Sequence, residues 1–310
     1  MATEGLRIGT RGSALALVQT QRVVKRLQKA HPRLHCQVSV VKTAGDHDRK
    51  RALREMGGRG VFVGALEDAL LRAEIDCAVH SLKDVPTDVP SDLVLAAFPE
   101  RADPHDVLVS GPGWTVESLP DGARVGTGSV RRRGRLLHAR PDLGVVAIRG
   151  NLDTRIRRML AGHCDALVLA RAGVVRLGRP ERVNVTVIPF AVMLPSAGQG
   201  TLAVEARRDD RSTRRLLRAI NNPGLALAAS VERFVLSELR AGCHGAVGVL
   251  ARVGAGRVHL RAVVVAPDGS ALVQAGARGS AKAWGQVGRE VLEQLWAQGA
   301  AGLIDRSRGA

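Results

Sequence analysis

Apolar and polar positions follow two alternating periods through the first two hundred residues. Leu6–Thr10 is a short apolar run, and Ser13–Ala30 carries an apolar stripe at helical spacing. His35–Lys42 alternates like a strand, Val61–Ala73 has a helical pattern, and Asp76–Val79 is typical of a buried strand. This order predicts α/β layers with mainly parallel sheets.

Two short stretches recur in the same order. Arg7–Ser13 (RIGTRGS) resembles Arg124–Ser129 (RVGTGS), and each leads from a strand through a turn into a helix. Further on, Asp76–Val79 (DCAV) resembles Asp165–Val168 (DALV). We therefore expect two similar lobes that close on a ligand. More residues separate the repeated stretches in the first half than in the second. Part of this insertion is Gly45–Gly60, a polar segment bounded by glycines, which predicts a mobile active-site loop.

A composition shift follows, with a charged helix (Arg207–Arg218) and then a linker or turn (Asn221–Gly224). Beyond it we expect a third, smaller α+β unit. Its predicted elements are a helix (Ala226–Leu239), two strands (Val247–Val253 and Val258–Ala266), a hairpin turn (Pro267–Gly269) and a last helix (Ala281–Gln298).

The charge of the chain adds a question about its ligand. The formal net charge is +17, and the cations are 40 Arg against 6 Lys. Nucleic acid is one explanation, a carboxylate-rich or phosphate-rich small substrate is a second, and solvated surface arginine is a third. With 4 Phe, 3 Trp and no Tyr, the chain lacks the aromatic platforms of single-strand nucleic-acid modules.

Targeting and redox features are absent from the sequence. The N-terminus has no apolar signal-peptide core, and no apolar run approaches the roughly 18 residues of a membrane span. The four cysteines form no CxxC pair and no zinc spacing. We expect a cytoplasmic protein with reduced thiols and no metal site.

The two Gly-Thr…Ser turns are candidate anion sites. A Ser at a strand-to-helix junction caps the helix, whose first N–H groups can hold an anion. Arg11 lies in the first turn, and Arg131 and Arg132 open the helix after the second. One such turn is more often a plain cap, but two turns with adjacent arginines favour carboxylate or phosphate binding.

A second arginine motif follows the predicted strand Val145–Ile148. Arg149 would lie near the carboxyl end of that strand, where open α/β sheets bind ligands, and Arg155 in the first turn of the next helix. We expect these two to be functional, and Arg157 and Arg158 to face solvent.

The motif His80–Pro86 (HSLKDVP) also follows a buried strand, so Asp84 and its neighbour Lys83 fall at a strand's carboxyl end. A carboxylate there could stabilise a developing cation or move protons. A structural salt bridge explains the same residues equally well.

One cysteine differs from the other three. Cys36, Cys77 and Cys164 lie in apolar strand patterns and are expected to be inert core residues. Cys243 lies in a Gly-flanked loop beside His244, where its thiolate would be favoured. A cysteine-protease interpretation is weak because neighbouring side chains diverge.

In combination these motifs closely resemble the porphobilinogen deaminase (hydroxymethylbilane synthase) family over nearly the whole chain. The segments that carry the resemblance are RIGTRGSALAL, HSLKDVPT, ERADPHDVLVS, GTGSVRR, RGNLDTR, LPSAGQG and AGC. The resemblance implies an α/β protein of three domains: two lobes like type II periplasmic binding proteins and a smaller α+β C-terminal domain that carries the cofactor cysteine. The implied boundaries are 1–99 with 197–219, 103–194, and 223–310.

The resemblance also implies a reaction. The family is a transferase that joins four porphobilinogen molecules head to tail, releases ammonia at each step and hydrolyses the product to the linear hydroxymethylbilane of porphyrin and haem biosynthesis. One dipyrromethane cofactor per chain would be held by a thioether, here to Cys243, and Asp84 would be the catalytic aspartate. Loss of ammonia leaves a cationic azafulvene that a carboxylate can stabilise.

The family pattern assigns further site residues by position. Those implied to hold the cofactor are Lys83, Asp84, Thr127, Ser129, Arg131, Arg132 and Cys243. Those implied to bind substrate are Arg11, Ser13, Gln19, Phe62, Arg149, Arg155 and Gln199. Positions that depart from the commonest pattern are Arg59, Gly64, Gly128, Ala241 and Ala246.

Each pyrrole of the implied substrate carries an acetate and a propionate group. These carboxylates explain an arginine-lined site better than nucleic acid does. We therefore expect porphobilinogen as the small-molecule partner, with no nucleic acid and no membrane, and the family implies a monomer. The alternatives are a non-enzymatic, bilobed carboxylate-binding protein and, less favoured, a nucleic-acid binder.

Overall fold

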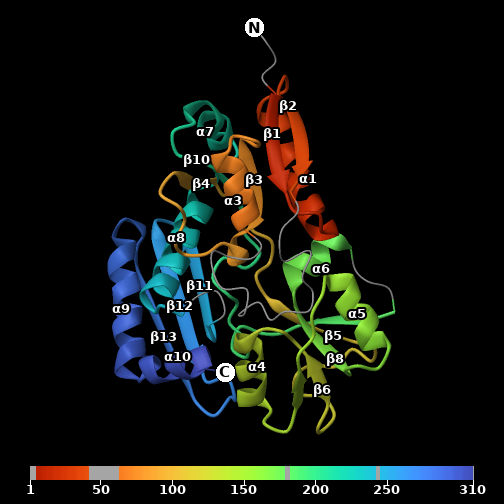
Figure 1. Ribbon diagram of the computed structural model, residues 1–310. Helices are drawn as coiled ribbons and strands as arrows, with labels where there is room; N and C mark the ends of the chain where they lie inside the picture. The colour runs from red at the N-terminus through yellow and green to blue at the C-terminus, as the bar shows by residue number, and fades with distance from the viewer. Residues whose placement is uncertain (1–4, 42–62, 179–181, 242–244, 310) are drawn as a thin grey trace. The chain divides into compact units, whose positions relative to one another are not determined.

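The computed structural model of the chain describes residues 5–41, 63–178, 182–241 and 245–309 (Figure 1). It divides into two compact units. The first unit is Met1–Ala102 with Gly200–Ala226, and the second is Asp103–Gln199 with Leu227–Ala310. The predicted loop Gly45–Gly60 lies outside the described residues.

The first unit is built on one five-stranded sheet. In spatial order its strands are β2 (His35–Val40), β1 (Gly5–Thr10), β3 (Cys77–Ser81), β10 (Leu202–Arg207) and β4 (Leu93–Ala97). β1 pairs in parallel with β2 and β3, whereas β10 is antiparallel to β3 and β4. A strand from far along the chain therefore lies inside this sheet, between β3 and β4.

Helices cover both faces of the first sheet: α1 (Ala14–Ala30), α3 (Gly64–Leu71) and α7 (Arg211–Arg218). The predicted apolar stripe of α1 is confirmed, because Val23 and Leu27 are fully buried. They form one cluster with Leu217 of α7. Leu66 and Leu70 of α3 belong to a separate cluster on the other face.

The second unit contains a five-stranded sheet of the same design. In spatial order its strands are β7 (Gly144–Val146), β6 (Arg124–Gly126), β8 (Ala166–Ala170), β5 (Asp106–Ser110) and β9 (Asn184–Val187). Its helices are α4 (Val130–Ala139), α5 (Leu152–Leu160) and α6 (Arg171–Leu177). β6 is parallel to β7 and β8, and β5 is antiparallel to both its neighbours. The expected pair of similar α/β lobes is confirmed.

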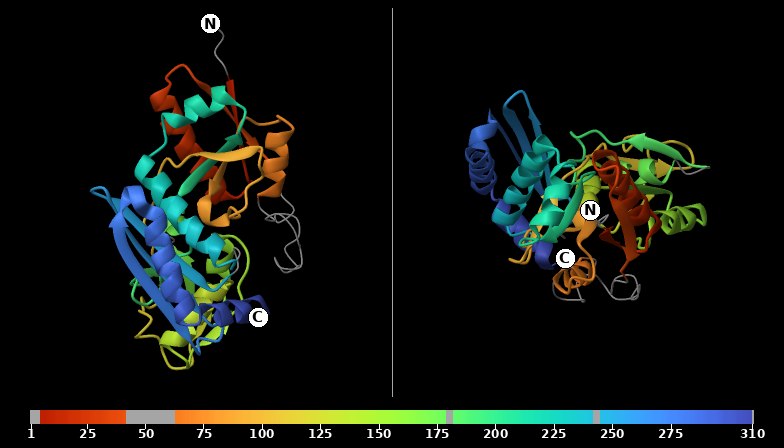
Figure 2. Two further views of the ribbon diagram at one scale, coloured as in Figure 1. Left: turned by 90° about the vertical axis from the view of Figure 1, so that its left-hand side faces the viewer. Right: turned by 90° about the horizontal axis from the view of Figure 1, so that it is seen from above.

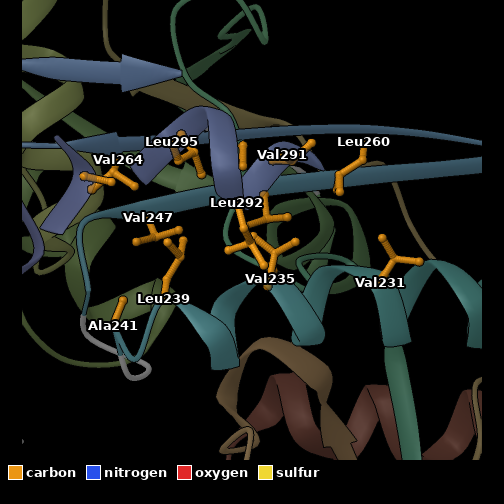
Figure 3. Packing of buried hydrophobic residues seen from close by; sticks show 14 of the residues in the cluster. Val231, Val235, Leu239, Ala241, Val247, Leu260, Val264, Val291, Leu292 and Leu295 are labelled. Carbon is orange, nitrogen blue, oxygen red and sulfur yellow. The ribbon is translucent and has the colours of Figure 1, made fainter. Parts of the chain in front are cut away.

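The rest of the second unit is a three-stranded antiparallel sheet with helices, the first of which, α8, begins in the last residues of the first unit. Its elements are α8 (Pro223–Glu238), β11 (Val247–Gly254), β12 (Arg257–Val265), β13 (Leu272–Ser280), η2 (Ala281–Ala283), α9 (Trp284–Ala297) and α10 (Ala300–Gly309). α9 runs along this sheet in both views of Figure 2. Figure 3 shows Val235 of α8 and Leu292 of α9 in one apolar cluster with the strands. The hairpin turn is confirmed: Gly269 has φ +76° between β12 and β13.

Three local predictions are wrong. The lobe sheets are mixed rather than mainly parallel, because β10 and β5 run against their neighbours. The predicted linker Asn221–Gly224 contains the start of α8, since Pro223 suits the first helical position and Asn222 Oδ1 accepts from Leu225 N at 3.1 Å. Arg207 ends β10, and the charged helix begins at Arg211.

The repeated stretches have a structural meaning. In the first lobe, Arg7 N donates to Asp76 Oδ2 (2.8 Å) and its guanidinium to Oδ1 (2.6 Å). In the second lobe, Arg124 N donates to Asp165 Oδ2 (2.7 Å) and its guanidinium to Oδ1 (3.2 Å). Each lobe thus ties the amino ends of two neighbouring parallel strands with one Arg–Asp pair.

The glycine that follows in each repeat permits close packing. A Cβ at Gly126 would lie 2.7 Å from Leu167 Cδ2 and 2.9 Å from Cys164 Sγ, and one at Gly9 would overlap the side chain of Ile75. Only a residue without a side chain fits between these strands and the chain that packs over them.

The sheets confirm the α/β class with a smaller α+β part. The three-domain boundaries stay a prediction, because the second lobe and the C-terminal sheet lie in one compact unit. In the parts of the chain that the structure describes, no helix is both long and apolar enough to cross a membrane.

Candidate functional site

The chain turns sharply at the carboxyl end of β3, where the HSLKD motif lies. Leu82–Asp84 forms the short 3-10 helix η1. Leu82 is buried and its N–H donates to Thr201 O of the strand opposite (3.0 Å), and the buried Val85 donates to Leu82 O (3.1 Å). Two buried residues thus hold the corner, while Lys83 is half-buried and Asp84 is exposed.

Two side-chain contacts support this corner from the sheet. Gln19, which is buried on α1, donates from Nε2 to Ser81 Oγ at 2.8 Å. His80 Nε2 lies 3.0 Å from Glu205 Oε2, and both side chains are almost fully buried. The polar groups behind Asp84 are therefore joined to α1 and β10.

The first Gly-Thr…Ser turn is a helix cap. Ser13 Oγ accepts from Ala16 N (3.3 Å) at the start of α1, whose first turn carries no acidic residue. Thr10, fully buried, accepts from Thr20 Oγ1 (2.8 Å) and so fixes the end of β1 against α1. Arg11 is half-buried between them. The absence of acidic residues in this first turn suits an anion.

The second turn repeats the cap in the other lobe. Ser129 Oγ accepts from Arg132 N (3.4 Å) at the start of α4, and the buried Thr127 accepts from Ser129 N (3.2 Å). A cavity of ≈ 440 Å³ opens beside this turn. Its lining residues are Thr127, Gly128, Ser129, Val130, Arg133, Val145, Ala147, Pro267 and Asp268.

Three residues predicted for ligand binding meet at one buried carboxylate, Asp106. Arg132 donates to Asp106 Oδ1 from Nη2 (2.7 Å) and Nε (3.1 Å), and Arg131 Nη1 lies 2.8 Å from Oδ2. Gln199 Nε2 donates to Asp106 Oδ1 (2.9 Å) and to Pro104 O (2.8 Å). Asp106 begins β5, whose amino end meets the carboxyl end of β8.

Burial and charge act in opposite directions on Asp106. Complete burial would raise the pKa of its carboxyl group, but the guanidinium groups of Arg131 and Arg132 outweigh burial and lower that pKa to about 2. Burial is also the main effect on Arg131, and it lowers the pKa of that guanidinium. The carboxylate is therefore charged throughout the physiological range.

Three of the four arginines in the motif after β7 are exposed. Arg149 is exposed, and Arg155 is half-buried with Nε donating to Gly150 O at 2.7 Å. Asn151 is the N-cap residue of α5, so Arg155 lies in the first turn. Arg157 and Arg158 are exposed, which confirms that they face solvent.

Cys243 and Phe62 lie outside the described residues. On either side of the segment 242–244, Ala241 and Ala246 are buried in the C-terminal core. The prediction for the other cysteines is confirmed for Cys77 and Cys164, whose thiols are buried and have raised pKa values because of that burial. Cys36 is half-buried, and burial raises its pKa as well.

Two functional candidates were missed in the sequence: Asp106 and the His80–Glu205 pair. Asp106 lies in the motif ERADPHDVLVS and His80 in HSLKDVPT. Both motifs carry the family resemblance, so the sequence did contain a signal that could have pointed to these residues. Their partners lie on other strands and on α4, and only the strand order brings them together.

Comparison with known families gives two matches. Residues 6–215 match the family model described as "Porphobilinogen deaminase, dipyromethane cofactor binding domain", and residues 226–297 match "Porphobilinogen deaminase, C-terminal domain". Relatives named porphobilinogen deaminase include one from Rubrobacter xylanophilus, 48% identical over 98% of both chains. Another, from Roseiflexus sp. strain RS-1, is 44% identical over 96% of this chain and 98% of its own.

Two of the solved structures that resemble the chain are distant in sequence. The effector-binding domain of BenM with benzoate is 11% identical, covering 71% of this chain and 91% of its own, with a TM-score of 0.44. The periplasmic VFT2 domain of BvgS from Bordetella pertussis is 18% identical, covering 74% and 93%, with a TM-score of 0.42. Scores at this level support no conclusion about the ligand of this chain.

Proposed function

The chain belongs to the porphobilinogen deaminase family, and on that premise we propose how its own residues serve the reaction. The reaction is that of a transferase in porphyrin biosynthesis, hydroxymethylbilane synthase. It joins four porphobilinogen molecules head to tail with loss of ammonia and then hydrolyses the linear product. The relatives match both lobes and the C-terminal part, so a non-enzymatic carboxylate-binding protein is not favoured.

One observation carries the catalytic assignment: Asp84 is an exposed carboxylate on a corner that Leu82 and Val85 hold from below. When the aminomethyl group of a pyrrole loses ammonia, the remaining pyrrole unit becomes cationic. A preorganised negative charge stabilises that cation. We assign Asp84 the stabilisation of that charge, with its carboxylate facing the substrate pyrrole N–H. Gln19 and Ser81 keep the corner aligned.

The second lobe fits the family's dipyrromethane cofactor. Arg131 and Arg132 are buried with one carboxylate, Asp106, between them, so one positive charge is left over. The acetate and propionate groups of a dipyrromethane are carboxylates of the chemistry that balances such a charge. When bound, the cofactor supplies the pyrrole to which substrate units are joined. We propose that Arg131 and Arg132, with Lys83, Thr127 and Ser129, hold its carboxylates.

Cys243 is our candidate for the attachment of the cofactor by a thioether. Ala241 and Ala246, near it in the sequence, are both buried. We further propose that the incoming substrate is bound by Arg11, Ser13, Gln19, Phe62, Arg149, Arg155 and Gln199.

The proposal also covers the domain boundaries, the cellular compartment and the oligomeric state. Separate apolar clusters in the first lobe, the second lobe and the C-terminal sheet support the division into domains 1–99 with 197–219, 103–194, and 223–310. A cytoplasmic monomer without nucleic-acid or membrane partners fits an enzyme that acts on a small soluble substrate.

The mass of the intact chain tests the proposal. We expect an excess equal to two linked pyrrole units, with peptide mapping placing it on Cys243, and we expect Cys243→Ser to carry none and to be inactive. Asp84→Asn should keep its fold and lose turnover by roughly 10²- to 10⁴-fold per loaded chain.

Asp88→Asn is the matched control, because Asp88 is an exposed carboxylate in the same loop and should leave turnover unchanged. An unmodified Cys243 in folded protein incubated with porphobilinogen would refute the attachment. Near-normal turnover of Asp84→Asn would refute the role of Asp84.

A further inference from the structure

Helix α4 buries an unusual amount of positive charge. Arg131, Arg132 and Arg135 are 2%, 6% and 7% exposed, whereas Arg133 on the same helix is exposed. A buried guanidinium is costly unless its N–H groups and its charge are both satisfied. Each of the three must therefore have a specific arrangement of partners.

Backbone carbonyls satisfy part of this need without cancelling charge. Arg135 donates to Val192 O (2.7 Å) and Ala191 O (2.8 Å). Arg131 donates to Leu194 O (2.6 Å), and Arg132 to Val168 O (3.1 Å). These acceptors fix the planes of the guanidinium groups but leave three positive charges.

Asp106 is the one carboxylate, among the described residues, that pairs with any of these arginines. Its Oδ1 accepts from both Arg132 donors and from the Gln199 amide, and its Oδ2 forms an ion pair with Arg131 Nη1 at 2.8 Å. Asp106 lies at the edge of the sheet where β6 and β8 end, the edge at which α/β sheets bind ligands. A carboxylate in this position sets where both guanidinium groups lie relative to that edge.

We infer that Asp106 is a positioning residue: it holds Arg131 and Arg132, and Gln199 beside them, in the arrangement with which the second lobe binds the dipyrromethane carboxylates. This inference rests on the proposed function, because it takes both arginines as cofactor ligands. Asp106 partly neutralises the pair and leaves one positive charge for an anionic ligand. Without it, two buried cations repel each other and lose their common anchor.

A purely structural Asp106 would affect stability alone, so the test must separate stability from binding. Asp106→Asn keeps the side-chain shape and removes the charge. Val109→Ala is the control, because Val109 is fully buried on the same strand and its truncation destabilises the lobe without touching the arginines. Urea unfolding ranks the stability of both variants against the unaltered chain.

The binding readout is the fraction of cofactor-free chains that acquire two pyrrole units during incubation with porphobilinogen, measured by intact mass. We expect Asp106→Asn to load about 10- to 100-fold more slowly than the unaltered chain, and its loaded fraction to show a raised KM. Val109→Ala should load normally. Equal loading of the two variants would overturn the inference.

Asp106→Asn combined with Arg135→Met covers the case in which the single variant does not fold. Arg135 is buried on the same helix but is not among the proposed cofactor ligands. Its removal restores the net buried charge of α4 and keeps Arg131 and Arg132, so we expect the double variant to fold and to load as slowly as the single variant. Normal loading of the double variant would overturn the inference while leaving the proposed function standing. An unaltered chain that never loads would overturn the proposed function and this inference together.

Discussion

A single ionisable group, Asp106, links the electrostatics of the second lobe to its stability. Its carboxyl group is fully buried, and Arg131 and Arg132 lower its pKa to about 2. A depressed pKa in the folded state means that folding favours the charged form. The resulting stability is complete above the unfolded-state pKa of roughly 4 and is lost as pH falls through about 2.

This linkage predicts how the chain unfolds in acid. Between about pH 4 and pH 2, the unaltered chain should lose a contribution of about 2 kcal/mol that Asp106→Asn no longer has to lose. The measurement is the free energy of unfolding in urea at several pH values across that range. Asp142, whose pKa is also lowered to about 2 but by an exposed contact with Arg140, provides the control.

Solvent screens the exposed pair, so Asp142→Asn should leave the slope of stability against pH nearly unchanged. If Asp106→Asn and the unaltered chain lose stability in parallel, the carboxylate does not carry this linkage.

At the level of single residues, sequence reasoning found side chains but not their partners. Arg131, Arg132 and Gln199 were selected from separate motifs, and the structure joins them at one aspartate. Asp106 lies inside a quoted motif, but its role depends on the strand order, which residue types do not reveal. Gln19 is likewise bonded to Ser81, a contact between elements far apart in sequence.

At the level of elements, the two repeated Arg–Asp pairs join equivalent strands but differ in burial and in the number of partners. Asp76 is 15% exposed and also lies 3.6 Å from Arg207, whereas Asp165 is 37% exposed and pairs with Arg124 alone among the described residues. Both accept a backbone N–H across the strands. The first pair should therefore contribute more stability than the second.

Alanine at each position tests this ranking. Asp76→Ala should cost about 2–3 kcal/mol, because it leaves the partly buried N–H of Arg7 and the guanidinium group of Arg7 without their acceptor, and Asp165→Ala about 1 kcal/mol. Hydrogen exchange of the β1 and β6 amides reports the two lobes separately. Asn variants, which keep an acceptor, should recover part of each loss. An equal cost at the two positions would contradict this account.

The hydrophobic pattern predicted most helices and strands but not the direction of the strands. A buried strand such as β10 has the same apolar run whether its neighbours are parallel or antiparallel, so the mixed sheets were not foreseen. Ends of elements were also displaced: Pro223 suggested a break but begins α8. Local patterns give the type of an element, while pairing depends on residues far away in the chain.

On the scale of the whole molecule, the first sheet depends on a strand that comes late in the sequence. β10, residues Leu202–Arg207, lies between β3 and β4 and pairs with both. Its side chains Leu202, Val204 and Ala206 belong to the apolar cluster of that unit. Without β10, the backbone groups of two strands lose their partners and part of the core is missing.

A chain that ends at residue 199 should therefore lack a folded first unit, whereas one that ends at residue 222, which restores β10 and α7, should form it. The measurement is hydrogen exchange of β1 and β3 amides, which should be unprotected in the shorter chain. β5–β9 amides should be protected in both, because the second sheet draws its strands from one continuous stretch. Equal protection of β1 in the two chains would contradict this expectation.

Because β10 comes late in the sequence, it also affects the order in which the two lobes fold during translation. The N-terminal half of the first lobe leaves the exit tunnel first, yet β10, an inner strand of its sheet, is translated after every strand of the second lobe. The sheet of the second lobe can therefore form while β3 and β4 still lack the strand that lies between them, and such unpaired edges are the kind of nascent surface that chaperones bind. In this chain the order of synthesis and the order of completion are opposite.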